Sequence, residues 1–209
     1  MVRYGRAVAP LTATLKARRA LWTSEAGVSL IDLMVVVSVV GILSAISLPA
    51  FDYWKQSMEL GSNARDVERT LQEARLKAVT SNRPIRVRFN CPTAGSYRMV
   101  EVIGTSATPD PKDSELNRCQ ESVYPYPAPD REPLTRPNHD GPVRTVAAKV
   151  TFGSGTKNLE FLPNGSVLVQ DGTTFVPFTT TEIRLLRELN LANSKVITVN
   201  SLGKVTLVP

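Results

Sequence analysis

The sequence predicts an α+β fold in which one long N-terminal helix packs on an antiparallel β-sheet domain. Two observations lead to this fold class. Up to residue 81 the apolar residues follow a helical spacing, and after Pro84 they alternate with polar residues, as in a strand with one buried face. The length of 209 residues fits one such domain preceded by an additional segment.

The predicted helix begins with a strongly apolar segment. Residues 28–51 contain a single charged side chain, Asp32. A helix over residues 28–48 would be about 31 Å long, close to the ~30 Å hydrocarbon core of a bilayer, so we expect residues 28–49 to cross a membrane once. Residues 1–27 hold four of the six excess positive charges. The positive-inside rule therefore places them in the cytoplasm and the C-terminal part in the periplasm.

Three kinds of N-terminal segment fit this pattern: a cleaved secretory signal, an uncleaved signal anchor and a prepilin leader. Ala45-Ile46-Ser47 offers a loose small-residue cleavage site for the first kind. Asp32 argues against it, because a carboxylate near the start of a membrane helix is unfavourable and normally has a binding partner.

Residues 27–37 resemble the prepilin cleavage and methylation motif, in which a Gly precedes the cut and an apolar residue begins the mature chain. The resemblance implies that residues 1–27 are a leader removed by a membrane prepilin peptidase between Gly27 and Val28, and that the new amine of Val28 is methylated. It further implies that Asp32, where the family usually has Glu, neutralises the amine of a neighbouring subunit inside a filament.

Residues 50–83 are predicted to form the amphipathic half of the same long helix. Pro49 is expected to kink the helix; the alternative is that the membrane helix ends there. Asn82 and Pro84 are expected to end the amphipathic half. Its apolar residues lie mostly three or four apart: Phe51, Trp54, Met58, Ala64, Val67, Leu71, Ala74 and Ala78.

Residues 84–209 are predicted to form a β-rich globular domain. Residues 104–145 contain eight prolines, which indicates a long irregular insertion. His139, within it, has no Cys or His nearby in sequence and is expected to be solvated. Strands are expected at 85–89, 97–103, 146–152, 159–162, 166–170, 173–178, 183–186, 196–200 and 205–208.

The sequence contains two cysteines, Cys91 and Cys119. In an oxidising periplasm an even number of cysteines favours a disulfide, which would attach the insertion to the first predicted hairpin. The alternative is two free thiols.

Three segments, Ala64–Phe89, Leu159–Val167 and Val196–Val208, resemble the GspH/FimT group of minor pilins and pseudopilins. The resemblance implies a structural subunit that helps to start or cap a type IV pilus or a type II secretion pseudopilus. Its partners would be other pilins, the prepilin peptidase and the inner-membrane assembly platform. Because the sequence has no phosphate-binding loop, HExxH or CxxC motif, we predict no enzyme activity, metal or cofactor.

Two further hypotheses remain open. Some FimT-like proteins bind DNA for uptake in natural transformation, and the candidate phosphate contacts here are Arg86, Arg88, Arg98 and Lys204. Alternating arginines on a strand also fit a simple solvated face. The second hypothesis is a membrane-anchored periplasmic module that never joins a filament.

Overall fold

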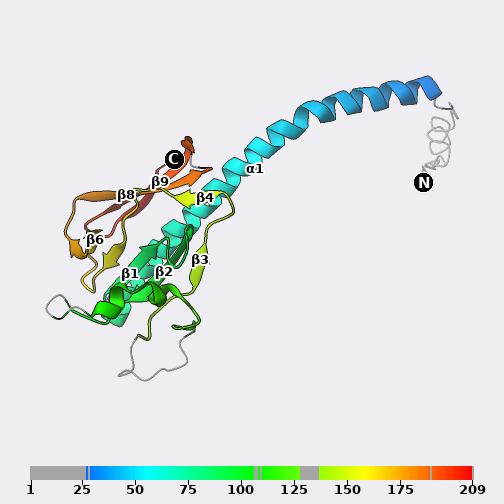
Figure 1. The fold of residues 1–209 in the computed structure, drawn as a ribbon. Coiled ribbons are helices and arrows are strands. Elements are labelled where there is room, and N and C mark those ends of the chain that lie inside the picture. Colours follow the sequence, from blue (N-terminus) through cyan, green and yellow to red (C-terminus); the bar gives the residue numbers. More distant parts are fainter. Residues whose placement is uncertain are drawn as a thin grey trace, which may run out of the picture. The chain divides into compact units, whose positions relative to one another are not determined.

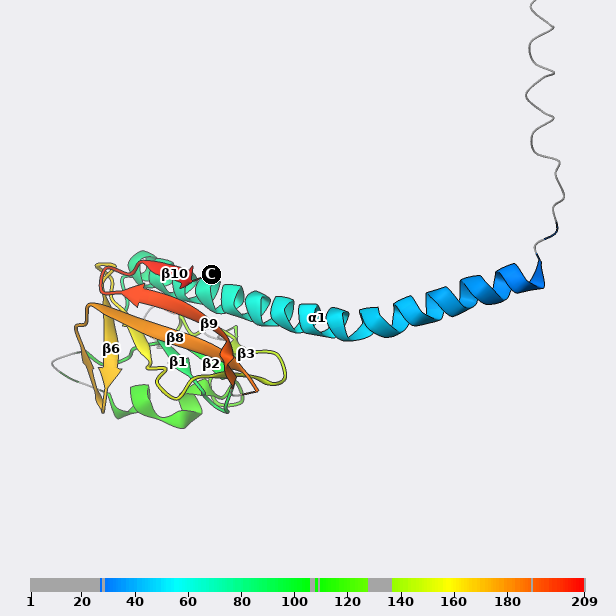
Figure 2. The same ribbon diagram turned by 90° about the horizontal axis from the view of Figure 1, so that it is seen from above.

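The computed structural model describes residue 27 and residues 29–105, 108, 110–127, 137–188 and 190–208, without the side chains of 47–50, 53 and 190–192. The predicted leader up to residue 26 and the first mature residue, Val28, lie outside the described residues. The chain divides into two compact units, residues 1–50 and 51–209. Figures 1 and 2 show the fold from two directions.

Helix α1 runs from Leu30 to Ser81. It continues through Pro49, so the alternative that the helix ends there is wrong. The kink stays a prediction, because the side chains around Pro49 lie outside those described. The helix ends where predicted: Asn82 adopts a left-handed conformation with φ 52°, which stops the helical hydrogen-bond pattern.

Unit 51–209 packs α1 against two sheets whose strand pairs are all antiparallel. The six-stranded sheet has the order β3-β2-β1-β5-β6-β7, and the four-stranded sheet has the order β10-β9-β8-β4. The predicted α+β class is therefore confirmed, with two sheets in the domain. The strands of the larger sheet are β1 (Ile85–Phe89), β2 (Ser96–Glu101), β3 (Val143–Thr145), β5 (Leu159–Phe161), β6 (Val167–Asp171) and β7 (Thr174–Val176). Those of the smaller sheet are β4 (Val150–Phe152), β8 (Thr180–Arg187), β9 (Asn190–Asn200) and β10 (Val205–Val208).

One hydrophobic core joins the helix to both sheets. It contains the inward residues of β1 and β2 together with Ile183 and Ile197 of the smaller sheet. Because residues three or four apart share one face of a helix, α1 presents a continuous apolar stripe to this core. The stripe consists of Leu60, Ala64, Val67, Leu71, Ala74 and Ala78, all at most 2% exposed.

The larger sheet is covered on its outer face as well. All five residues of β1 are buried, so the prediction that this strand has one solvated face is wrong. The cover consists of two short 3-10 helices of the 104–145 insertion, η1 (Pro111–Ser114) and η2 (Leu116–Cys119). Strand β3, also part of the insertion, extends the sheet beside β2. These parts of the insertion are therefore ordered against the sheet and are not the irregular loop that the prolines predict.

Candidate functional site

The N-terminal part of α1, within unit 1–50, exposes almost every side chain that the structure describes there. Leu30 is 74% exposed and Ile46 is 68% exposed, and the apolar residues between them lie in the same range or slightly below it. Asp32 lies in the first turn and is the only charged residue from 30 to 46. Among the described residues, no helix meets the length and hydropathy needed to cross a membrane.

Gly27 is exposed, and open space surrounds its α-carbon. Val28, the residue expected to become the methylated N-terminus, lies outside the described residues. The cut between the two residues and the role of Asp32 therefore stay predictions.

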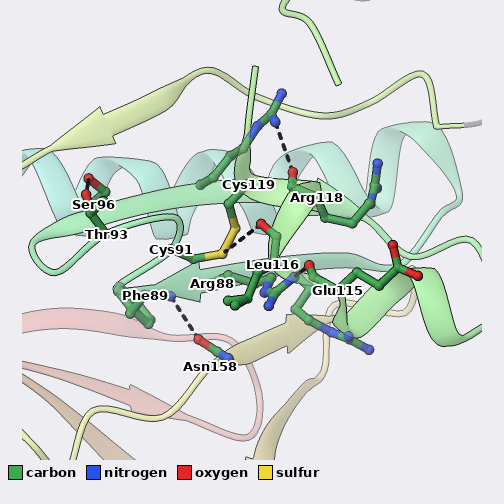
Figure 3. Close-up of a disulfide and its surroundings, with 12 residues drawn as sticks. Arg88, Phe89, Cys91, Thr93, Ser96, Glu115, Leu116, Arg118, Cys119 and Asn158 are labelled. Carbon is green, nitrogen blue, oxygen red and sulfur yellow. Dashed lines mark hydrogen bonds between the residues drawn. A yellow bond between two sulfur atoms is a disulfide. The ribbon is translucent and has the colours of Figure 1, made fainter. Parts of the chain in front are cut away.

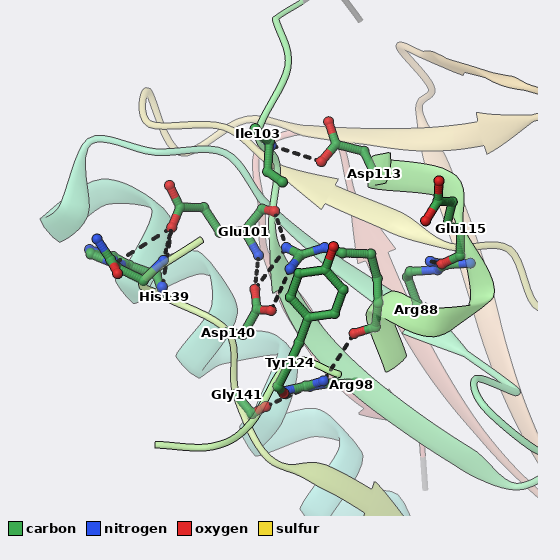
Figure 4. A network of polar contacts seen from close by, with 12 residues as sticks. Arg88, Arg98, Glu101, Ile103, Asp113, Glu115, Tyr124, His139, Asp140 and Gly141 are labelled. Carbon is green, nitrogen blue, oxygen red and sulfur yellow. Dashed lines mark hydrogen bonds and ion pairs between the residues drawn. The ribbon is translucent and has the colours of Figure 1, made fainter. Parts of the chain in front are cut away.

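Arg98 of β2 is the central residue of a polar network beneath the insertion (Figure 4). Its side chain is fully buried. The guanidinium donates from Nε to the carbonyl of Gly141 at 2.8 Å, from Nη1 to that of Arg118 at 2.9 Å and from Nη2 to that of Tyr124 at 2.6 Å. Burial lowers the pKa of Arg98, although the nearby Asp140 opposes this shift. One side chain thus binds three separate parts of the insertion.

A second buried pair, Arg118 and Asp140, lies beside Arg98. Arg118 donates from Nη1 and Nη2 to the two carboxylate oxygens of Asp140, at 2.7 and 2.9 Å. Asp140 also accepts the amide of Glu101 at 2.8 Å, and Arg118 donates to the carbonyl of Glu101 at 2.7 Å. Burial raises the pKa of Asp140, and the charge of Arg118 opposes that shift. The pair therefore fastens the insertion to the end of β2.

Arg86 and Arg88 of β1 hold the 3-10 helices. Arg86 pairs with Glu160 on the neighbouring strand at 2.8 Å, and donates to the carbonyl of Asp113 at 3.0 Å. Arg88 donates to the carbonyls of Ser114 and Glu115. Burial lowers the pKa of Arg88, and the like charge of Arg86 adds to this effect.

These contacts correct the sequence analysis on the candidate DNA-binding arginines. Arg86 and Arg88 are 8% exposed and Arg98 is 0% exposed. They form neither a surface patch for phosphates nor a solvated strand face, because their donors point into the covered side of the sheet. Lys204, the fourth candidate, is exposed in the turn between β9 and β10.

The predicted disulfide is confirmed: Cys91 and Cys119 are bonded, with their α-carbons 5.5 Å apart (Figure 3). It joins the turn after β1 to the end of η2. The disulfide and the arginines therefore attach the insertion to the same sheet by independent covalent and polar links.

His139 lies beside this network and is half-buried, so the expectation of a solvated side chain is wrong. Its backbone amide and that of Asn138 donate to Oε2 of Glu101, at 3.1 and 2.8 Å. Within the described part of the chain, no cluster of three His, Cys, Asp or Glu side chains could hold a metal ion.

Sequence reasoning missed Arg118, Asp140 and Glu101, which lie in or beside the proline-rich segment. One signal was present. Three arginines occupy the outer positions of β1 and β2, and like charges so close together repel each other on a strand face that only water covers. Glu160 lies opposite Arg86 on the neighbouring strand. The sequence therefore indicated an ion pair on this face at one position, between Arg86 and Glu160.

The long helix, its exposed apolar N-terminal part and the sheet domain packed on its C-terminal part define a pilin-like subunit. A family model described as type II transport protein GspH matches residues 63–203, more than half of the chain. The chain therefore belongs to the GspH family of minor pilins and pseudopilins.

Solved structures give looser similarities. The type IV minor pilin FimU of Pseudomonas aeruginosa is 20% identical, with a TM-score of 0.43 over 72% of this chain and 89% of FimU. The minor pseudopilin EpsH of the Vibrio cholerae type 2 secretion system is 15% identical, with a TM-score of 0.41 over 72% of this chain and 96% of EpsH. No curated protein sequence matches the chain. The family assignment depends on the match to residues 63–203.

Proposed function

We propose that this chain is a minor subunit of a type IV pilus or a type II secretion pseudopilus, and that it acts at the start or tip of the filament. The observation that carries the proposal is the exposed, largely apolar surface of α1 from Leu30 to Ile46, in which Asp32 is the only charged residue. An apolar surface this long requires either a lipid environment or other protein to cover it. In a subunit that moves from the membrane into a filament, lipid covers this surface first and other subunits cover it afterwards.

Before assembly, residues 28–49 anchor the chain in the inner membrane and residues 84–209 lie in the periplasm. The prepilin peptidase cuts after Gly27 and methylates Val28, and the assembly platform then adds the chain to other pilins. In the filament Asp32 neutralises a positive charge that would otherwise be buried without a partner. No observation favours the DNA-uptake hypothesis, since three of its four candidate residues are buried.

Cleavage at Gly27 tests this proposal. Gly27→Val is expected to leave a full-length precursor in the membrane fraction, detected by its slower migration and by its intact N-terminal mass. Gly41→Val is the matched control, because Gly41 also has open space around it but lies inside the helix; this variant should be processed normally. Asp32→Ala should be processed but absent from sheared filaments. Normal mature protein from Gly27→Val, or Asp32→Ala at wild-type levels in filaments, would contradict the proposal.

A further inference from the structure

Three bulky side chains form an exposed cluster on the first turns of α1 within unit 51–209. Phe51 and Trp54 are each 59% exposed and Met58 is 56% exposed, and the centroids of the two rings lie 6.4 Å apart. Their spacing of three and four residues places them on one side of the helix. Leu60 lies about 180° around the helix from Phe51 and meets the core instead. The domain therefore leaves the aromatic side of these turns open to contact with another surface.

The cluster follows directly after the segment proposed to anchor the chain in the membrane. Helix α1 continues from that segment, so Phe51 and Trp54 lie about 3 Å and 7.5 Å beyond residue 49 along the helix. The headgroup region on one side of a bilayer is roughly 5–7 Å deep. Asp52 is the first charged residue after Asp32, which places the end of the hydrocarbon core before residue 52. Both aromatic residues therefore fall within or at the edge of the headgroup region.

Helix geometry and the chemistry of tryptophan favour the same placement. Long side chains on an α-helix lean toward its N-terminus, so we expect the ring of Trp54 to lie nearer to the anchor than its own backbone does. A tryptophan ring combines a large apolar surface with one N–H donor. In the headgroup region the ring meets acyl chains while the N–H donates to ester or phosphate oxygens. In the hydrocarbon core the same donor would lack a partner, which is unfavourable.

We propose that Phe51 and Trp54 bind the phospholipid headgroup layer on the periplasmic side of the inner membrane before the chain enters a filament. The inference rests on the proposed function, because it needs the anchor formed by residues 28–49. It adds a lipid-binding surface on unit 51–209 that sets the depth of the helix. A deeper position would bury Asp52 in hydrocarbon, and a shallower one would expose the ring of Trp54 to water.

The fluorescence of Trp54 tests this depth without any substitution. The chain has two tryptophans, Trp22 and Trp54, and only Trp54 remains once the predicted leader is removed. The mature chain, residues 28–209, is reconstituted into phosphatidylcholine vesicles whose acyl chains carry bromine, which quenches tryptophan at short range. Bromine near the glycerol end of the acyl chains should quench at least two-fold more strongly than bromine near their methyl ends. Stronger quenching by the deeper bromine, or equal quenching by both, would overturn the proposal.

A tryptophan moved along the same side of the helix is the matched control. Leu76 is 65% exposed and lies about 33 Å beyond Trp54 along α1, rotated from it by only about 40°. In the double variant Trp54→Phe and Leu76→Trp, the shallow bromine should quench at least five-fold less than in the wild type. Equal quenching at the two positions would overturn the proposal, because the lipid contact would then not be confined to the first turns after the anchor.

Flotation of the same vesicles separates this inference from the proposed function. If the mature chain floats with the vesicles but neither bromine position quenches Trp54, the lipid contact is wrong and the membrane anchor stands. If the chain does not float, the anchor fails and the lipid contact fails with it. Emission that is blue-shifted, unquenched by bromine and shifted to the red when the ratio of lipid to protein is raised would assign Phe51 and Trp54 to a contact between two copies of the chain instead.

Discussion

Removal of Arg118 is expected to destabilise unit 51–209 more than any other arginine substitution in the network. The side chain is 0% exposed and forms two hydrogen bonds to Asp140, whose own side chain is 3% exposed. Arg118→Met keeps an elongated side chain but leaves the carboxylate of Asp140 and the carbonyl of Glu101 without these donors. Removing one partner of a buried ion pair costs about 3–5 kcal/mol.

Urea unfolding of residues 51–209, followed by far-ultraviolet circular dichroism, measures this loss. With a denaturant slope of about 2 kcal/mol per molar, a loss of 4 kcal/mol lowers the midpoint by about 2 M. The matched control is Arg69→Met, because Arg69 is 76% exposed and lies 3.8 Å from Asp66; exposed pairs contribute about 0–1 kcal/mol. Arg118→Met combined with Asp140→Leu should recover part of the loss, since no unpaired charge remains. If Arg118→Met is no more destabilising than Arg69→Met, the reasoning on the buried network is refuted.

Three further predictions concern the same unit. Replacing Cys91 and Cys119 by Ser opens a bridge over a sequence separation of 28 residues and should lower the free energy of unfolding by about 3.5 kcal/mol; a loss below 1 kcal/mol would contradict this. Gly203→Ala should cost about 1–3 kcal/mol, because φ is +76° and the new methyl would meet Arg75. Gly155→Ala, which has open space around it, is its control and should be nearly neutral. The pKa of Asp140 is raised by burial above its ordinary 3.8, so its contribution to stability is complete below about pH 3.8 and is lost as the pH rises through its folded value. We therefore expect the difference in free energy of unfolding between the wild type and Asp140→Asn to decrease as the pH rises from 3.8 to 7. An increase of this difference with pH would contradict the prediction.

The periodicity of apolar residues was sufficient to predict the helix and most strands. The spacing of Ala64, Val67 and Leu71 gave the buried face of α1, and the alternation in 85–89 gave β1 with its observed bounds. The cysteine count gave the disulfide. These features follow from local geometry: a helix repeats every 3.6 residues and a strand every two.

The cover on the sheet could not be predicted in the same way. Alternation assigns Arg88 to the outer face of β1 but does not say whether water or protein lies there. The 3-10 helices of the insertion have no apolar period, and they are held by bonds between side chains and backbone carbonyls far apart in sequence. Arg98, for example, reaches carbonyls 20, 26 and 43 residues away. Such pairings leave no repeating pattern in the sequence.

The way in which the arginines hold the insertion has a consequence for its surface. Arg86, Arg88 and Arg98 together donate to six backbone carbonyls of residues 113–141. Every residue type has a backbone carbonyl, so these bonds do not depend on which side chains the insertion carries outward. Leu116 and Val123 are 67% and 50% exposed, and their side chains make none of these six bonds. The fold therefore fixes where the described part of the insertion lies without depending on its outward side chains.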